Sequence, residues 1–293
     1  MNAPLDPKQV RRAFSRAAKS YSQNSILQRK IEDRMLERLE YFEKKPQRIL
    51  DVGCGPGRAS SLLRKRYKRA QIISLDLALP MLRRVRTGWR HPLLRVCADA
   101  CALPLPDASI DIVFSNLCIQ WIDDLPRLFD EFRRVLRPGG YVAFSTFGWD
   151  TLHELRSAWA AVDRADHVSA FADIARLGDA MIAAGFRDPV LDCDHFVLKY
   201  PDATSLMREL KSIGATNASA NRPRGLTGKG QFRQVLNAYD QFRQDGELPA
   251  TYEIICAHAW GPEPGQPRRG SGDGEIATFS VDSLRGSRRR SSE

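Results

Sequence analysis

Short apolar runs alternate with helically spaced apolar residues along the first half of this chain. The short runs contain β-branched residues and occupy residues 48–52, 71–75, 93–97, 110–114 and 141–145. Runs of this kind are typical of strands buried on both faces of a sheet. Apolar residues at helical spacing lie between them, at residues 58–67, 80–87 and 125–136. Because strands that alternate with helices form mainly parallel sheets, the pattern predicts an α/β fold.

The second half of the chain adds more helices and two alternating segments. Helices are expected at residues 151–162, 174–184, 203–213 and 232–242, and strands at 190–199 and 251–260. With these two, the predicted sheet has seven strands. We expect it to be mixed and mostly parallel, with helices on both faces and further helices inserted as a lid.

Two helices are predicted before the first strand, and the composition changes after the last. Residues 6–21 form a basic amphipathic pattern, and residues 26–42 carry a second apolar stripe that ends before Pro46. Residues 261–293 are rich in Gly, Pro, Ser and Arg, which predicts disorder. The predicted organisation is therefore a helical cap over 1–45, one domain over 46–260 with helical insertions near 150–171 and 202–245, and a tail over 261–293.

A glycine-rich turn follows the first predicted strand. Asp51 lies near the end of this strand, and Gly53, Gly55 and Gly57 follow with one residue between each pair. Glycine lets the backbone turn tightly and lets a ligand approach without interference from Cβ. A phosphate favours neutral or positive surroundings at a helix N-terminus, whereas a carboxylate here suits a ligand with a cationic amino group. The alternative is a glycine-rich turn that binds nothing.

This turn resembles motif I of the class I S-adenosylmethionine-dependent methyltransferases. Their ligand carries an ammonium and a sulfonium group and no phosphate. The resemblance implies a Rossmann-like fold and S-adenosyl-L-methionine as the cofactor. The helix at 125–136, the Arg-Pro-Gly-Gly turn at 137–140 and the strand at 141–145 also look like this class.

Acidic residues follow the second and third predicted strands. Asp76, followed by Leu77, lies where doubly wound folds place the acid that binds ribose hydroxyls, about 20 residues after the glycines. Its alternative role is to cap the helix at 80–87. Asp99 and Ala100 follow the third strand, where an acid of the class I methyltransferases accepts a hydrogen bond from the adenine amino group. The alternative for Asp99 is an ordinary loop acid.

Polar residues also follow the fourth predicted strand. Asn116 and Gln120 are candidates for the cofactor or acceptor pocket, because residues at the carboxyl ends of strands line the crevice of an open α/β fold. We place Asn116 with the cofactor and Gln120 among the candidate catalytic residues. Trp121 is interpreted as part of the pocket wall.

Composition describes a globular chain with an uneven charge. Hydrophobic residues make up 43% and charged residues 27%, and no apolar run reaches the length of a membrane helix. The N-terminus lacks a signal pattern, and the six cysteines lack metal-binding spacing, so we expect a cytoplasmic protein with no metal. Residues 1–100 hold 23 Lys and Arg against 9 Asp and Glu. This excess of basic residues attracts an acidic partner, or it has no role beyond keeping the protein soluble.

Several stretches outside the shared core carry a closer resemblance. They are VRRAFSRAAKSY at 10–21, SNLCIQW at 115–121, LKSIGATN at 210–217, RGLTG at 224–228 and TYEIICAHAW at 251–260. Together they resemble the malonyl-acyl-carrier-protein O-methyltransferases of biotin synthesis over residues 10–260. The IGATN and RGLTG segments are the more specific, because many methyltransferases share the core motifs. The tail has no counterpart that we expect in this family.

The family resemblance implies methyl transfer to the free carboxyl of a malonyl thioester on an acyl carrier protein. Such a carboxyl has a pKa near ~4 and is ionised at neutral pH, so no general base is needed. Catalysis then depends on alignment and on exclusion of water. Acyl carrier protein is acidic, and the hypothesis is that basic residues dock it. The candidates are Arg11, Arg12, Arg16 and Lys19, or Arg222, Arg224 and Lys229.

Two aromatic residues complete the predicted catalytic set with Gln120. Tyr21 and Phe171 lie in segments that we expect to cover the cofactor. Their ring faces would shield the positive sulfur by cation–π attraction. Ordinary packing of both rings is the competing interpretation.

Other functions share some of these features. A methyltransferase of another small molecule, such as a quinone precursor, would have every core motif. A nucleic-acid methyltransferase or binder is suggested by the basic charge, but residues 115–118 read SNLC where an Asn/Asp-Pro-Pro-Tyr base-flipping motif would stand. A protein that binds the cofactor without catalysis would also keep Asp51, Asp76 and Asp99. We expect neither a membrane nor a nucleic acid as the partner.

Overall fold

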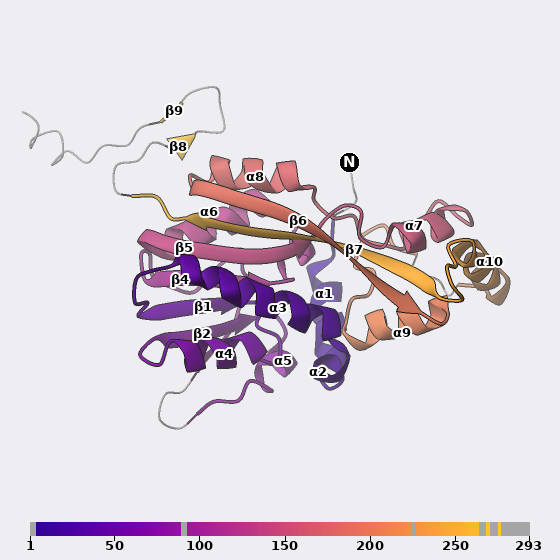
Figure 1. Cartoon of the computed structure of the whole chain (residues 1–293), viewed down its shortest axis with the longest axis horizontal. Helices are drawn as coiled ribbons and strands as arrows, with labels where there is room; N and C mark the ends of the chain where they lie inside the picture. Colours follow the sequence, from indigo (N-terminus) through magenta and orange to yellow (C-terminus); the bar gives the residue numbers. More distant parts are fainter. Residues whose placement is uncertain are drawn as a thin grey trace, which may run out of the picture.

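A seven-stranded mixed sheet forms the centre of the molecule (Figure 1). The computed structural model describes residues 4–88, 93–223, 225, 227–263, 268–269 and 275–276. The strands are β1 (Arg48–Val52), β2 (Gln71–Asp76), β3 (Leu94–Cys97), β4 (Ile110–Asn116), β5 (Leu136–Phe147), β6 (Arg187–Tyr200) and β7 (Leu248–Trp260). Their order is β3-β2-β1-β4-β5-β7-β6, and β7 runs antiparallel to both neighbours while the other pairs are parallel. The predicted mixed, mostly parallel sheet is confirmed.

Helices cover both faces of the sheet, as the apolar pattern of β1 requires. Ile49 packs into the core under α3 (Ile26–Arg38) and α4 (Arg58–Arg66), whereas Leu50 packs into the core under α6 (Leu125–Val135) and α8 (Ile174–Ala183). Successive residues of a strand point to opposite faces, so a strand apolar at every position needs a helical layer on each side. Both residues are fully buried.

The helix predicted at 80–87 is much shorter in the structure, which corrects the sequence prediction. Only Leu79–Leu82 forms a helix, α5. Bonds spanning three residues follow, from the Arg84 and Val85 amides to the carbonyls of Met81 and Leu82. This tighter turn brings Val85 against Gly57 of the glycine-rich turn. Contact across the fold therefore overrides the local helical spacing.

The N-terminal segment is also divided differently from the prediction. The helix expected over 6–21 ends earlier, as α1 (Pro7–Ala17), and α2 (Tyr21–Asn24) follows it. Ser20 lies at the break, and its hydroxyl donates to the carbonyls of Ala17 and Ser212, at 3.2 and 2.7 Å. A short 3-10 turn, η1 (Leu39–Tyr41), closes α3.

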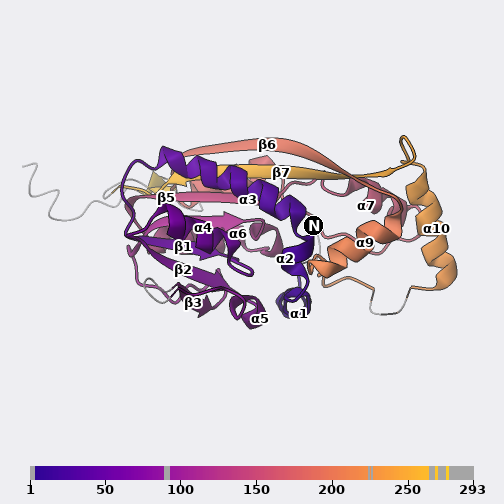
Figure 2. The ribbon, with the colours of Figure 1, turned by 60° about the horizontal axis from the view of Figure 1, so that its bottom comes forward.

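A group of helices extends beyond the sheet at the end where β6 finishes and β7 begins (Figures 1 and 2). These are α7 (His153–Ala160), α9 (Ala203–Ser212) and α10 (Lys229–Asp240). The N-terminal segment is tied to the loop after α9, because the Asp6 amide donates to the Ala218 carbonyl at 2.8 Å and the Ala220 amide to Pro4 at 2.7 Å. The N-terminal helices and the inserted helices therefore meet over one edge of the sheet.

Two short paired strands lie within the predicted tail, β8 (Arg268–Arg269) and β9 (Glu275–Ile276). Apart from these and residues 261–263, the predicted disordered tail lies outside the described residues. In the part of the chain that the structure describes, no helix is long and apolar enough to cross a membrane.

Gly214, within the IGATN segment, allows α1 to pack closely on the inserted helices. Its φ is +80°, and a Cβ there would lie 3.1 Å from Phe14 Cδ1 and 3.2 Å from Phe14 Cα. Glycine adopts this left-handed backbone readily, while other residues pay about 1–2 kcal/mol. The IGATN segment therefore provides the surface on which α1 packs.

We expect Gly214→Ala to lower the free energy of unfolding by about 2 kcal/mol, from the backbone strain and the displaced Phe14. Urea unfolding measures the change. The matched control is Gly230→Ala in α10, where a Cβ meets no atom within 4 Å; it should leave stability unchanged or slightly raised. Equal unfolding midpoints for the two variants would contradict this role of Gly214.

Candidate active site

Two adjoining cavities lie at the carboxyl ends of β1 and β2. The Asp76 cavity, about 310 Å³, is lined by Asp76, Leu77, Asp99 and Ala100 among others. The Asp51 cavity, about 170 Å³, is lined by Asp51, Glu32 and Asn116 among others. Tyr21, Gly53 and Gly55 line both cavities. The structure thus gathers the predicted cofactor residues other than Gly57 around two neighbouring cavities.

The three glycines of the turn have different surroundings. Gly53 has φ +68°, and a Cβ on it would lie 2.3 Å from the Sγ of Cys118, so the backbone itself forms part of the cavity floor. Gly55 has φ +53°, and a Cβ there would reach only Tyr21, at 3.8 Å. Gly57 has φ +82° and faces Val85, whose methyl groups a Cβ would overlap. Gly57 therefore supports the packing of α4 and lines neither cavity.

Asp76 anchors the glycine-rich turn and does not cap α5, whose N-cap residue is Ala78 and which has no side-chain cap hydrogen bond. Its Oδ2 accepts from the Gly55 amide at 2.9 Å, and its Oδ1 accepts from the Ala78 amide at 2.7 Å. The second bond is local, but the first fixes the glycine-rich turn. Each carboxylate oxygen has a second lone pair, and the side chain lines the Asp76 cavity. Asp76 can therefore hold the turn and still accept hydrogen bonds from a ligand's hydroxyl groups.

Three carboxyl groups surround the glycine-rich turn with little exposure to water. Asp51, Glu32 and Asp76 are 1%, 9% and 9% exposed. Burial raises the pKa of Asp51 to about 7, that of Glu32 to about 7 and that of Asp76 to about 6. Repulsion from Glu32 and Asp76 adds to the effect on Asp51, while the Ser60 hydroxyl, which donates to Asp51, opposes it. Arg58 pairs with Glu32 from the other side.

These acids make the cavities suited to a cation. A buried carboxylate with a raised pKa gains stability when a positive charge is placed beside it. Arg29, Arg58 and Arg127 are the basic residues that line the two cavities, against Glu32, Asp51, Asp76, Asp99, Asp123 and Asp124. The surroundings therefore favour a ligand that carries positive charge at one end and donor groups at the other, which S-adenosylmethionine satisfies.

Cation binding here should depend on pH with a defined sign. Below about pH 7 Asp51 and Glu32 hold protons in the free protein, and a cationic ligand must displace them. We expect affinity for S-adenosylmethionine to rise from pH 5.5 to 7 and then level off, with protons released on binding below pH 7. Calorimetry in two buffers of different ionisation enthalpy measures the release. Asp51→Asn should reduce it, and equal release in the two proteins would contradict this assignment.

Asn116 joins the sheet to α3. Its Nδ2 donates to the Gln28 carbonyl at 3.0 Å, and its Oδ1 accepts from the Ser145 hydroxyl at 2.8 Å. Both bonds fix the side chain at the wall of the Asp51 cavity. Asp99 is exposed, and its Oδ1 accepts from the Cys101 amide at 2.9 Å in a local turn. Both therefore lie where the sequence placed them, at the cavity walls.

Two further cavities lie beside the Asp76 and Asp51 cavities. The Phe171 cavity, about 680 Å³, is lined by Gln120, Phe171 and Arg176 among others. The His167 cavity, about 70 Å³, shares Phe171 with it, Trp121 with the Asp76 cavity and Gln28 with the Asp51 cavity. This small junction cavity therefore borders the other three, and the Asp76 and Phe171 cavities also border each other directly through Leu5, Ile122 and Asp123.

The predicted catalytic residues are divided between these spaces. Tyr21 lines the Asp76 and Asp51 cavities, and Phe171 lines the Phe171 and His167 cavities. Gln120 is 9% exposed and already engaged, because its Nε2 donates to the Leu117 carbonyl at 2.8 Å and its Oε1 accepts from Thr146 at 3.4 Å. Tyr21 and Phe171 therefore line different cavities and do not cover one cavity together.

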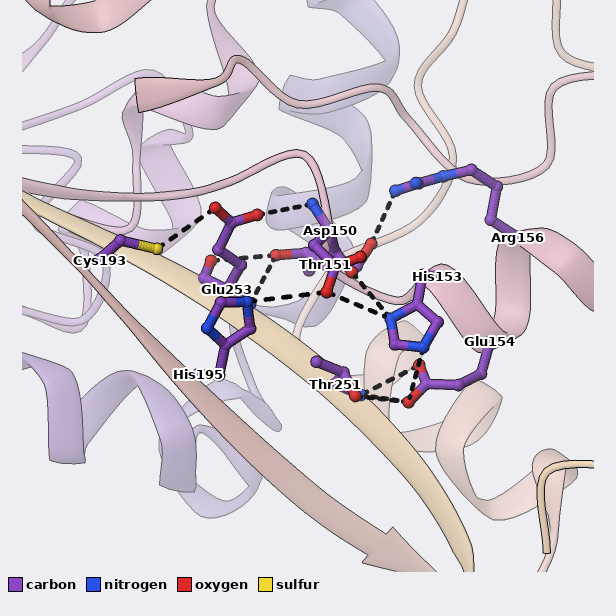
Figure 3. Close-up of polar contacts among 9 residues, drawn as sticks. All are labelled: Asp150, Thr151, His153, Glu154, Arg156, Cys193, His195, Thr251 and Glu253. Atoms are coloured by element: carbon purple, nitrogen blue, oxygen red, sulfur yellow. Dashed lines mark hydrogen bonds and ion pairs between the residues drawn. The ribbon is translucent and has the colours of Figure 1, made fainter. Parts of the chain in front are cut away.

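A network of hydrogen bonds holds the start of α7, which carries part of the junction wall (Figure 3). Glu253 accepts from the Asp150 amide at 2.7 Å, and Glu154 accepts from the Thr251 amide at 3.1 Å. Both acids are buried. Their bonds fix the chain on either side of Leu152, a residue with φ +57° that lines the His167 cavity. The network holds the start of α7 against β7.

Some residues of the site were missed from the sequence, including Glu32, Gln28 and Cys118. Glu32 offered a signal, because it lies on the inward side of its helix beside the buried Ile31 and Met35. An acid at such a position needs a partner or a ligand. Gln28 and Cys118 gave no signal, since their place depends on how α3 and the loop after β4 meet.

Comparisons with known proteins agree with the geometry. A methyltransferase domain family matches residues 50–144. The malonyl-acyl-carrier-protein O-methyltransferase of Xylella fastidiosa (strain M23) is 48% identical over the whole of both chains. The protein of the same name from Gallionella capsiferriformans (strain ES-2) is 46% identical over 91% of this chain and 95% of its own.

Solved structures show the fold alone. The YcgJ protein of Bacillus subtilis superposes with a TM-score of 0.54 at 14% identity, over 78% of this chain and 98% of its own. The [4+2]-cyclase SpnF superposes with a TM-score of 0.50 at 20% identity, over 80% of this chain and 81% of its own. Because a cyclase shares this architecture, the fold by itself does not determine the reaction.

Proposed function

Because this chain belongs to the malonyl-acyl-carrier-protein O-methyltransferase family, we propose that it methylates the free carboxylate of a malonyl thioester carried by an acyl carrier protein. S-adenosyl-L-methionine is the methyl donor. The product is the malonyl methyl ester that primes biotin precursor synthesis. The observation that carries the proposal is 48% identity to a relative of this name over the full length of both chains.

The reaction requires no proton transfer. When bound, S-adenosylmethionine supplies a methyl carbon that a carboxylate oxygen attacks, while the C–S bond breaks and its electron pair stays on sulfur. The acceptor carboxyl is ionised at neutral pH, with a pKa near ~4. The protein's contribution is therefore to align the groups and to exclude water. Tyr21 and Trp121 form walls between the cavities and suit the second task.

The residues around the two cofactor-side cavities fit the donor by their chemistry. Asp51 and Glu32, buried and with raised pKa values, suit the ammonium group. Asp76 suits the ribose hydroxyls, and Asp99 the adenine amino group. Leu77, Ala100 and the backbone at Gly53 and Gly55 supply apolar and close-packed walls. Tyr21 lines both cavities, so its ring face is available to a sulfonium between them.

The Phe171 cavity suits the arm of the acceptor. It is the largest of the four and borders the junction cavity along the shared residues Val168, Ser169 and Phe171. A long thioester arm can enter there while its carrier stays outside. Quinone-like acceptors are not favoured, because the relatives that cover the chain act on malonyl-acyl-carrier protein by name.

The proposed docking surface for the carrier is α1. Arg11, Arg12 and Arg16 are exposed, and none of them forms an ion pair with a carboxylate in the described part of the chain. Arg222 is less suitable, because it already pairs with Asp6 at 3.1 Å. Arg224, another candidate, lies outside the described residues.

Reversal of these three charges should weaken the carrier reaction specifically. We expect Arg11→Glu/Arg12→Glu/Arg16→Glu to raise KM for malonyl-carrier protein about 10- to 100-fold, with kcat and the rate on a small malonyl thioester little changed. The matched control is Lys65→Glu/Lys68→Glu/Arg69→Glu, which makes the same charge change near the end of α4. Steady-state kinetics at two salt concentrations gives both values. Equal effects of the two triple variants would reject α1 as the surface.

The proposed reaction is tested by transfer of labelled methyl groups. Purified protein is incubated with methyl-labelled S-adenosylmethionine and malonyl-, acetyl- or unacylated carrier protein, or with RNA. Label on the malonyl form alone supports the proposal. Label on RNA, or on every carrier form equally, would replace it with a different acceptor.

A further inference from the structure

The junction cavity contains one residue that can carry a positive charge. Most of its lining is apolar or aromatic, from residues such as Phe147, Leu155 and Ile213. His167 is the exception among the described residues that line it, since Gln28, Ser169, Thr216, Asn217 and Tyr252 are neutral donors or acceptors. An imidazole can be a cation near neutral pH. An anion that reaches this cavity therefore meets one side chain that is able to carry a positive charge.

The imidazole is held rigidly from two sides. Its Nε2 lies 2.9 Å from both carboxylate oxygens of Asp163, and its ring stacks on Trp159 with 3.6 Å between centroids and 9° between planes. Asp163 is fixed in turn by the Ala165 amide at 2.9 Å and by Gln231 of α10. A carboxylate only accepts hydrogen bonds, so Nε2 carries the proton. Within the described chain the hydrogen bonds of this ring are all at Nε2, which leaves Nδ1 for a ligand.

The position of this ring matches the chemistry that the proposed acceptor presents. A malonyl group differs from an acetyl group by one terminal carboxylate. The junction adjoins the Asp76 cavity through Trp121 and the Phe171 cavity through Phe171 itself. A thioester arm in the Phe171 cavity would thus present its terminal group beside His167 and next to the donor.

Other basic residues are less well placed for this role. Arg29 lines the Asp51 cavity beside Glu32, and its Nη1 donates to the Ser22 carbonyl. Arg176 is an exposed residue on α8 at the Phe171 cavity. His153 and His195 lie together near Asp150 at the base of the lid (Figure 3), and neither lines the junction.

We propose that His167, positioned by Asp163 and Trp159, binds the free carboxylate of the malonyl acceptor and selects it over acyl groups that lack one. The inference rests on the proposed function. Because Nε2 already donates to Asp163, the ring takes up a second proton from solvent at Nδ1 as the carboxylate binds. One carboxylate oxygen accepts from this Nδ1–H, which leaves the second oxygen for the methyl group. The methyl ester that forms is neutral, so it loses the charge-assisted hydrogen bond from Nδ1 and leaves more easily.

The test compares binding of two carriers that differ only in the carboxylate. Malonyl- and acetyl-carrier protein are titrated into the enzyme saturated with S-adenosylhomocysteine, which prevents turnover. We expect wild type to prefer the malonyl form, and His167→Gln to lose about 10- to 100-fold of that preference while its affinity for the acetyl form changes little. Asp163→Asn keeps the ring on Trp159 and should lose part of the preference. The control is His195→Gln, an exposed histidine, which should behave as wild type.

The outcomes separate this inference from the proposed function. If His167 had only a structural role, His167→Gln would weaken the binding of both carriers equally or reduce S-adenosylhomocysteine binding. Either result overturns the inference. An unchanged preference in both His167→Gln and Asp163→Asn also overturns it, while methyl transfer by wild type keeps the proposed function. A wild-type enzyme that transfers no methyl group to malonyl-carrier protein overturns both.

Discussion

Replacing Gly53 with alanine is expected to abolish cofactor binding and to lower the free energy of unfolding by about 3 kcal/mol. The residue has φ +68°, a conformation that costs a non-glycine residue about 1–2 kcal/mol. The new Cβ would also lie 2.3 Å from the Sγ of Cys118, a distance that forces the turn or the loop after β4 to move. Because Gly53 lines both the Asp76 and the Asp51 cavity, the movement would reach the proposed cofactor site.

Two further variants separate strain from overlap. Gly55→Ala has a similar backbone penalty, with φ +53°, but its Cβ would meet only Tyr21 at 3.8 Å, so we expect about half the loss of stability. In Gly53→Ala/Cys118→Ala the overlap is relieved and stability should partly return. Thermal and urea unfolding with and without S-adenosylmethionine measure these effects. No recovery in the double variant would show that Cys118 is not the obstacle.

Replacing Asp76 with alanine is expected to weaken S-adenosylmethionine binding about 100- to 1,000-fold, equivalent to about 3–4 kcal/mol. The substitution removes the acceptor proposed for the ribose hydroxyls. It also leaves the Gly55 and Ala78 amides without their partner, so the glycine-rich turn loses its anchor. Asp76→Asn retains one carboxamide oxygen and should have a smaller effect.

The matched control is Asp99→Ala in the same cavity. Asp99 is exposed and holds only a local turn through the Cys101 amide, so we expect a loss of about tenfold or less from its contact with the ligand. Calorimetry measures both affinities, and urea unfolding reports the change in stability. Equal losses of S-adenosylmethionine affinity for Asp76→Ala and Asp99→Ala would contradict the larger role proposed for Asp76.

The sheet could be predicted because its strands are fixed by local composition. β1, β2 and β4 are short apolar runs that need cover on both faces, and the structure provides it. The helix expected at 80–87 was wrong, because Val85 is drawn against Gly57 and the turn tightens after Leu82. Helical spacing alone carries no information on such a contact between distant segments.

The site could be predicted in part for the same reason. Asp51 and Asp76 lie at the carboxyl ends of β1 and β2, and Asp99 lies just after β3. These strands are parallel, so the topology alone brings the three acids to one end of the sheet. Glu32 and His167 come from segments outside the core of the sheet, and their place depends on how the N-terminal and inserted helices fold back over it. His167 takes its position from contacts with Trp159 and Asp163, and no spacing rule connects these residues to the cofactor residues.

The most direct test of the proposed reaction is the position of the transferred methyl group on the product. The enzyme is incubated with malonyl-carrier protein and S-adenosylmethionine that bears a trideuterated methyl group, and the product is examined by tandem mass spectrometry. We predict one labelled methyl group on the terminal carboxyl of the malonyl group, and none on an acetyl carrier. Label on a side chain of the carrier, or none on the malonyl form when cofactor binding is intact, would contradict the proposed carboxyl methyltransferase activity.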